Sequence, residues 1–502
     1  MVVKTRRNSI KAKMKSRRNI LASAAFGVAF LIIPVVVIFI DPIFLVAQYQ
    51  LKLTKNSLLS YFLKKELKGA LLEVYLFNVT NAERFLDGAD KKMKMKEIGP
   101  FVYQEYRSNE DIDFDNEAPV IRFTPKLRTV FMPDKSVGDP KDITLNVPNI
   151  SLLTVSTLME PYPFVVRQLY NILVNQVDTE GIVARDVHSC LWGFRDPIVS
   201  IAKTLAPGLI YYDSIGILER LYDPYVKYRI EMGREGVDKF KVLNVQRTRK
   251  EKMFDSNDPV NKYFEFNDTY EGAAFPPLMT PQTPVNLYRL GICKSFQMKY
   301  QSQEELKLGA KLFVYGYSNS TFENTKICDS KGWCPFGLMD LSSCFYHLPM
   351  ALSKSHFLDA DPLLLEKVEG LKPNRAVHDS SLLVDPKAGL TIGTTLELQL
   401  NIMTTDLTFN HQSRLFSDTI VPIARAKITL PEPPEETRSS LKLMYETGPQ
   451  ILLILEIISC SLGILLLLNS GRLAWRERRR ELGPKTFTPL QGKISAQPLL
   501  SS

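Results

Sequence analysis

The feature that most constrains this chain of 502 residues is a pair of long apolar segments, one near each end. Residues 20–40 carry no charged side chain. At about 1.5 Å of rise per residue, a helix of this length crosses the hydrocarbon core of a bilayer. Residues 451–468 form a second, shorter run with one acidic residue, Glu456. A buried core helix is the alternative for each run, but we predict transmembrane helices at residues 20–41 and 449–470.

The charges that flank these segments predict the topology. Residues 1–19 hold eight basic and no acidic residues, and residues 471–502 hold seven basic and two acidic residues. Positive charge beside a membrane span stays in the cytoplasm, so both tails are predicted to be cytoplasmic. The first span lacks a cleavage site and is interpreted as an uncleaved signal anchor. Residues 42–448 then form one extracellular or luminal domain.

Charge and motifs also exclude several classes of function. The chain has a net charge of +9, and the two tails contribute more than all of it, so the domain between them is mildly acidic. This distribution argues against a nucleic-acid partner and favours contact of the tails with anionic membrane lipid. No metal-binding, phosphate-binding or nucleophile motif is present, so we predict no cofactor, no metal site and no enzymatic activity.

Cysteines and glycosylation sequons agree with an extracytoplasmic domain. Five cysteines fall in residues 42–448, so one stays unpaired if disulfides form. The six-residue separation of Cys328 and Cys334 is easily bridged. Four asparagines stand in Asn-x-Ser/Thr sequons and are predicted glycosylation sites: Asn78, Asn149, Asn267 and Asn319.

The pattern of apolar residues predicts a single α+β domain. Within the leucine-rich residues 50–76 we expect a helix that leaves the membrane and passes into a strand at 73–78, and we expect strands within 101–130. Further strands are predicted at 312–317, 382–385, 391–403 and 420–430. Residues 151–177 read as helix interrupted by Pro161 and Pro163, with an apolar stripe typical of a core helix.

Several short strings, in order along the chain, match a known family. Residues 97–103 read EIGPFVY, residues 191–197 read LWGFRDP and residues 274–277 read AFPP. Further matches lie at Cys293, at residues 341–344 and at residues 385–389. From residue 77 to residue 463 the chain resembles the class B scavenger receptor family.

The resemblance implies a fold and a function. The expected fold is a two-pass membrane protein whose ectodomain is an antiparallel β-barrel with a lipid-lined tunnel and a helical bundle at its apex. The expected function is that of a cell-surface receptor that binds lipids, fatty acids, sterols or lipoproteins and transfers them toward the membrane. The plasma membrane is the expected location, and the lysosomal membrane is the second choice because the Leu499-Leu500 pair lacks an upstream acidic residue.

The resemblance also implies roles for individual residues. Cys293 with Cys344, and Cys328 with Cys334, resemble two family disulfides. Phe264 stands where one cysteine of a third family disulfide would be. Cys190 is then left unpaired, and we expect it to be a small buried residue and not a reactive thiol. The family binds ligands at its apex, which here would include Leu153, Leu158, Phe164, Val165, Arg167, Leu169 and Ile172. With Arg167 as the one basic residue in this stretch, apolar contact is favoured over capture of anionic ligands.

Two questions remain open at this level. The two-span plan also describes ligand-gated ion channels, which we keep as an alternative of another class. Glu456 is costly in lipid. It fits a place near the outer interface, a pairing with the first span, or a contact in a homo-oligomer.

Overall fold

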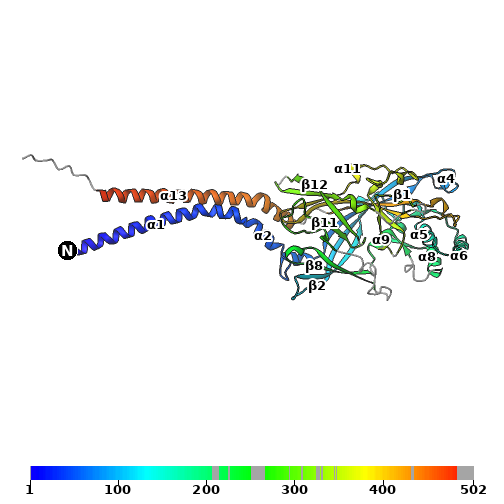
Figure 1. Ribbon diagram of the computed structural model, residues 1–502, viewed down its shortest axis with the longest axis horizontal. Coiled ribbons are helices and arrows are strands. Elements are labelled where there is room, and N and C mark those ends of the chain that lie inside the picture. Colours follow the sequence, from blue (N-terminus) through cyan, green and yellow to red (C-terminus); the bar gives the residue numbers. More distant parts are fainter. Residues whose placement is uncertain are drawn as a thin grey trace, which may run out of the picture. The chain divides into compact units, whose positions relative to one another are not determined.

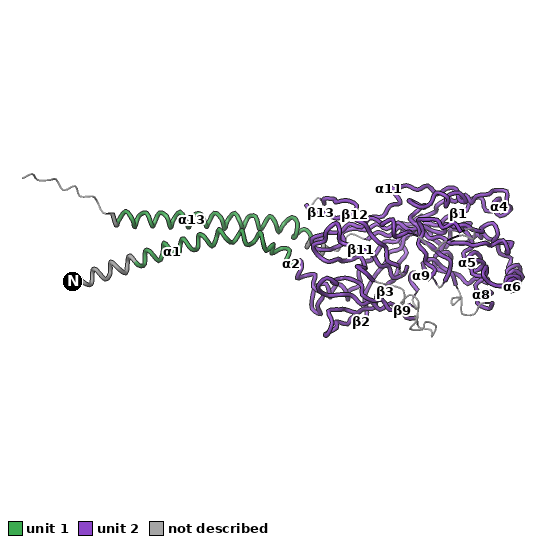
Figure 2. The backbone as a smooth tube through the Cα atoms, in the orientation of Figure 1, with its two compact units in different colours: residues 1–46, 439–502 green, residues 47–438 purple. Residues whose placement is uncertain are grey.

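The computed structural model describes residues 2–205, 214–223, 226–249, 266–292, 294–306, 309–323, 328, 332–343, 345, 347–430 and 435–482. The chain divides into two compact units (Figures 1 and 2). The first comprises residues 1–46 and 439–502, and the second comprises residues 47–438.

Two long helices dominate the first unit. They are α1 (Val2–Ile40) and α13 (Gly448–Leu482), the latter preceded by a π-helical turn at Leu443–Thr447. Two stretches are long and apolar enough to cross a membrane: Met14–Ile40, within α1, and Leu443–Arg480, which comprises the π-helical turn and most of α13. Only 11% and 6% of the residues in their most apolar windows are buried, so neither is the buried core helix that was the alternative.

The helices α1 and α13 lie side by side along their apolar stretches. Gly27 and Gly463 face each other so closely that a Cβ on Gly463 would stand 2.9 Å from the Gly27 carbonyl oxygen. The hydroxyl of Ser459 donates to the carbonyl of Phe30 at 2.7 Å. Small residues and hydroxyl-to-carbonyl hydrogen bonds are how helices associate in lipid, where there is no hydrophobic drive to pair them.

The second unit is built on one large sheet. Its strands are β1 (Leu67–Val79), β2 (Met93–Phe114), β3 (Val120–Phe131), β8 (Val226–Gly233), β9 (Val242–Arg249), β10 (Thr269–Tyr270), β11 (Val285–Arg289), β12 (Lys294–Glu305), β13 (Lys311–Tyr317), β14 (Met339–Asp340), β15 (Met350–Ser353), β16 (Val368–Glu369), β17 (Ser381–Asp385), β18 (Leu390–Met403) and β19 (Ile420–Thr429). Two small ladders, β4 (Thr144–Pro148) with β5 (Ile182–Asp186) and β6 (Phe194–Arg195) with β7 (Ser214–Ile215), stand apart from it.

The large sheet curls into a nearly closed barrel. Its strand order runs from β10 through β11, β12, β13, β17, β18, β19, β1, β2, β3 and β8 to β9. The two ends of this series meet at one isolated bridge, between Lys241, just before β9, and Tyr270 of β10. Pairing is antiparallel except between β10 and β11 and between β16 and β2. The expected antiparallel barrel is therefore confirmed.

Short helices complete the second unit. They are α3 (Leu58–Lys64), α4 (Ala82–Leu86), α5 (Ile150–Met159), α6 (Phe164–Asn175), α7 (Val187–Trp192), α8 (Pro197–Leu205), α9 (Ile217–Leu221) and α11 (Arg375–His378). The helix α2 (Pro42–Gln50) crosses the boundary between the units, as does α12 (Glu435–Lys442). The break between α5 and α6 falls at Pro161 and Pro163, as predicted.

Most of the strand predictions are confirmed. The strands β2 and β3 cover the predicted range 101–130, and β13, β17, β18 and β19 correspond in turn to the predictions at 312–317, 382–385, 391–403 and 420–430. The boundary predicted near residue 73 is wrong, because β1 already begins at Leu67. β1 pairs with β2 on one side and β19 on the other, and this double pairing outweighs the local helical preference of the leucine-rich sequence.

Candidate functional site

An apolar cavity lies on the inner face of the strands β1, β18 and β19. Alternate residues of a strand face the same side of a sheet, and these strands present apolar side chains at every second position. The residues that line the cavity from these strands are Ala70, Leu72 and Val74, then Leu398 and Leu400, then Ala424, Ala426 and Ile428. In the register, Leu72 is opposite Ile428, and Val74 and Leu398 both face Ala426. The lining is therefore one continuous apolar wall.

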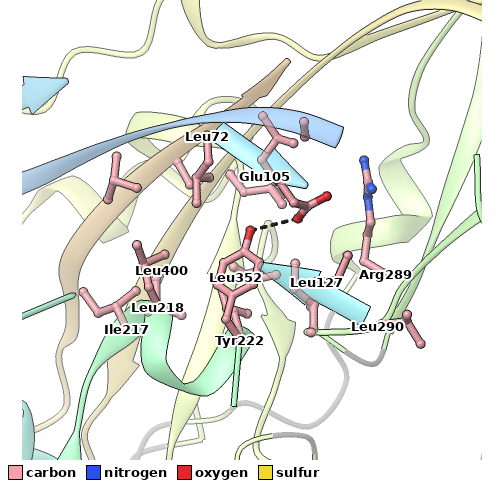
Figure 3. A pocket seen from close by; sticks show the side chains of 18 of the residues that line it. Leu72, Glu105, Leu127, Ile217, Leu218, Tyr222, Arg289, Leu290, Leu352 and Leu400 are labelled. Carbon is pink, nitrogen blue, oxygen red and sulfur yellow. Dashed lines mark hydrogen bonds between the residues drawn. The ribbon is translucent and has the colours of Figure 1, made fainter. Parts of the chain in front are cut away.

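The other walls come from elements distant in sequence. The helix α9 contributes Ile217 and Leu218, β3 contributes Leu127 and β15 contributes Leu352 (Figure 3). The cavity volume is about 150 Å³. Ala70, Ala424 and Ala426 are the smallest side chains that the strands β1 and β19 contribute to the lining. A dry apolar cavity of about this size in a protein core binds small apolar molecules.

Charged groups lie at the edge of this cavity, and most of them are paired. The hydroxyl of Tyr222 donates to the carboxylate of Glu105 at 3.0 Å (Figure 3). The guanidinium of Arg107 forms an ion pair with Glu271 at 2.7 Å. Burial, strengthened by the Glu105 carboxylate, raises the pKa of Tyr222 well above its ordinary value, so the phenol stays neutral. Arg289 lines the same cavity from the end of β11.

A buried ionic network occupies the opposite face of the same strands. Arg425 alternates with the cavity-lining Ala424 and Ala426, and its guanidinium bridges Glu97 at 2.7 Å and Glu397 at 2.8 Å. Glu397 is fully buried. Burial raises the pKa of Glu397 and outweighs the opposing effect of Arg425. For Glu97, hydrogen bonds from His356 and Arg425 outweigh burial and lower its pKa.

Two stacked histidines adjoin this network. The rings of His356 and His378 lie 4.2 Å apart, and the Nε2 atom of His356 is 2.6 Å from the Glu97 carboxylate. Each Nδ1 atom accepts a backbone N–H, from Lys372 for His356 and from Asn374 for His378. Burial, with the positive charge of Arg425 and the neighbouring imidazole of His356, lowers the pKa of His378 to about 4. The ionic network therefore lies on the face of β18 and β19 that points away from the cavity, and the face that lines the cavity is apolar.

The residues predicted at the apex divide into two groups. On α5, Leu153 is fully buried and Leu158 packs against the core. On α6, four apolar side chains are exposed, by 67% for Phe164, 75% for Val165, 46% for Leu169 and 56% for Ile172. The guanidinium of Arg167, on the same helix, lies over the ring of Phe409 at 5.3 Å. None of these residues lines the cavity.

The cysteines and the sequons occupy distinct environments. Cys328 and Cys334 form the predicted disulfide, and Cys190 is free and buried, also as predicted. Cys293 and Cys344 lie outside the described residues. Asn267 and Asn319 are exposed and Asn78 is half-buried. Asn149 is only 3% exposed, and its side-chain amide donates to Thr179 and Glu180.

Comparison with known proteins decides the family. The model of the CD36 family matches residues 21–474, nearly the whole chain. This chain belongs to the CD36 family. The expected membership of the class B scavenger receptors is thereby confirmed, and the chain is a two-pass membrane protein with cytoplasmic termini.

Named relatives of this CD36-family chain fall into two groups. Scavenger receptor class B member 1 of Bos taurus is 25% identical over 463 residues, which cover 90% of this chain and 89% of the relative. The protein of the same name in Mus musculus is 28% identical over 405 residues, covering 77% and 76%. Lysosome membrane protein 2 of Mus musculus is 26% identical over 340 residues, covering 66% and 68%.

Sequence reasoning missed the cavity-lining residues. The alternation of Leu72 with Val74, and of Leu398 with Leu400, is readable in the sequence and predicts an inward face. Which inward face is packed and which is hollow depends on side chains from α9, β3 and β15, and no local pattern encodes that. Phe275, in the AFPP string, is fully buried, with its ring centre 5.1 Å from that of Tyr270, and it does not line the cavity.

Proposed function

We propose that this CD36-family protein is a cell-surface receptor that takes a lipid into the apolar cavity of its barrel and transfers it toward the membrane. The observation that carries the proposal is the cavity of about 150 Å³ lined by the continuous apolar wall of β1, β18 and β19. Interiors of proteins are otherwise close-packed, so an apolar space of this kind favours an apolar occupant.

The charge and chemistry of the cavity support a binding role over a catalytic one. The charged groups Glu105, Arg107 and Glu271 are engaged by Tyr222 or by each other. Within the described part of the chain no group of acidic, histidine or cysteine side chains is arranged to hold a metal ion. The lining therefore offers apolar contact, which suits fatty acids, sterols and the lipids carried by lipoproteins.

The location follows from the family and the tails. Relatives include a scavenger receptor and a lysosome membrane protein. The Leu499-Leu500 pair near the end of the chain has no acidic residue upstream among residues 495–498. We therefore place the protein at the plasma membrane, and labelling of intact cells with an ectodomain antibody tests this.

The test of the cavity is a substitution that fills it. Ala426→Phe puts a ring into the space between Val74 and Leu398. In cells expressing the full chain, we expect uptake of a labelled fatty acid or sterol to fall close to the level of untransfected cells. Ala376→Phe, on an exposed face of α11, is the matched control and should take up lipid normally. Undiminished uptake by Ala426→Phe at equal surface expression contradicts the proposal.

A further inference from the structure

A second cavity, apart from the lipid cavity, has no role in the proposed function. It lies between β12, the 3-10 helix Asn319–Phe322, the ring of Phe336 and residues of the segment 354–375. It shares no lining residue with the lipid cavity. Its volume is about 680 Å³. Clefts of roughly 300–1,000 Å³ commonly hold a small ligand.

The charged side chains of this second cavity balance one another. The ammonium group of Lys354 lies 2.7 Å from the carboxylate of Asp359. The guanidinium of Arg375 also pairs with Asp359, and it pairs with Asp379 at 2.9 Å. The two other charged residues of the lining are opposite in sign. Paired groups of this kind keep hydrogen-bonding positions but have little net charge to attract an ion, so the cavity suits a ligand that is polar and neutral.

One aromatic ring in the wall of the second cavity is exposed. The side chain of Phe336 is 53% exposed, while Phe322 and Leu358 in the same wall are buried. A sugar ring has C–H groups on its face and hydroxyl groups around its edge. It can therefore lie against the phenylalanine ring and hydrogen-bond to the paired charges at the same time.

The same wall carries a predicted attachment site for sugar. Asn319, the first residue of the sequon at 319–321, lines the second cavity and is exposed. Its side-chain amide makes no hydrogen bond within the described part of the chain. The backbone around it is held in place, because the carbonyl of Gln297 accepts the N–H of Ser318 at 2.9 Å and the hydroxyl of Thr321 at 2.7 Å. A glycan on Asn319 therefore begins at the cavity wall.

We propose that the second cavity binds the chain's own N-linked glycan, carried by Asn319, with its first N-acetylglucosamine units against the ring of Phe336. Covalent attachment keeps these sugars beside the cavity at a high effective concentration, so weak contacts are enough to hold them. Because the two cavities have no lining residue in common, this site holds carbohydrate whether or not the barrel transfers lipid.

Hydroxyl-radical footprinting tests the proposal, because it measures the exposure of single phenylalanine rings in the folded, full-length protein. The protein is expressed in animal cells, and one portion is treated under native conditions with an amidase that removes N-linked glycans. We expect oxidation of Phe336 to rise several-fold after the treatment, since its ring loses the sugar that covers it. Phe164, which is 67% exposed on α6, is the internal control and should be oxidised equally in both samples.

Two variants complete the design. Asn319→Gln removes the attachment site and should leave Phe336 as readily oxidised as in the deglycosylated wild type. It also provides the readout if the glycan resists the enzyme, and the enzyme provides the readout if this variant fails to fold. Asn267→Gln removes another exposed sequon, whose asparagine does not line the second cavity, and should leave Phe336 protected.

Three results would overturn the proposal. The first is equal oxidation of Phe336 with and without the glycan, in protein whose Asn319 is shown to carry one. The second is a wild-type protein whose Asn319 carries no glycan. The third is a rise at Phe164 as large as that at Phe336, because removal of the glycans has then loosened the domain as a whole.

Discussion

At the scale of single residues, the barrel depends on a charge buried between two others. Arg425 holds Glu97 and Glu397 from one strand position, and its guanidinium also lies 3.9 Å from the centre of the Tyr75 ring. Removing one partner of a buried pair leaves the other charge uncompensated, which costs far more than the pair itself contributes. Sequence alone does not reveal this network, because its members lie up to 328 residues apart.

We predict that Arg425→Leu lowers the free energy of unfolding by about 3–5 kcal/mol, because Glu397 then stays buried without a cation. Arg128→Leu is the matched control, since Arg128 pairs with Glu66 where both side chains are exposed by 52% and 46%. The control should have a much smaller effect, because ion pairs exposed to solvent contribute little to stability. Thermal unfolding of the purified full chain measures both. Equal effects of the two substitutions contradict the assignment.

His378 makes stability depend on pH. Its pKa of about 4 in the folded chain lies below its ordinary value of 6.5. The unfolded chain therefore binds the proton more readily. The stabilisation is complete above pH 6.5 and is lost as the pH falls toward 4.

We predict that His378→Asn, whose side-chain oxygen can replace the Nδ1 acceptor, reduces the loss of stability over this pH range by on the order of 1–3 kcal/mol. Unfolding in denaturant at a series of pH values, for the wild type and the variant, checks this. Parallel curves for the two proteins would falsify the role of His378. His356, Arg425 and Glu97 are the titratable and charged groups that face the His378 ring. All three are unchanged in the His378→Asn variant, so the difference between the two proteins reports on His378.

At the scale of elements, the sequence predicted helices and strands better than their ends. The proline break between α5 and α6 and the strands β13, β17, β18 and β19 follow from local pattern, because turn residues and alternation are local properties. The start of β1 at Leu67 does not follow from local pattern, because the pairing of β1 with β2 on one side and with β19 on the other determines it. The burial of α5 was also readable, because its ten residues contain no charged side chain.

The start of α5 conflicts with one predicted glycosylation site. Asn149 is the N-cap of α5, and its side-chain oxygen accepts the N–H of Leu152 at 3.1 Å. Its amide nitrogen, the atom that would carry a glycan, is engaged with Thr179 and Glu180. An N-cap contributes about 1 kcal/mol, and a glycan would displace it.

We therefore predict glycans on Asn78, Asn267 and Asn319 and none on Asn149. Mass spectrometry of glycopeptides from protein expressed in animal cells measures the occupancy of each site. The exposed Asn267 and Asn319 serve as internal positive controls. Substantial occupancy at Asn149 contradicts the described start of α5.

At the scale of the whole molecule, one chain combines two membrane-spanning helices with a barrel that has an apolar interior. The topology was readable from composition, because charge and hydropathy are distributed so unevenly along the chain. The barrel and a space inside it were expected through family resemblance, and the residues that line the cavity came only from the structure. The expected apex site stays a prediction: its α6 side chains are exposed and apolar, while Leu153 lies in the core.

The most direct test of the account is to locate the bound lipid. A long-chain fatty acid with a photoreactive group on its chain is added to membranes containing the full-length protein, illuminated, and the labelled peptides are identified. We predict labelling of peptides that carry cavity residues of α9, β18 and β19, and its loss with excess unlabelled fatty acid. Labelling confined to the spans at 14–40 and 443–480, or to the exposed face of α6, would contradict the account.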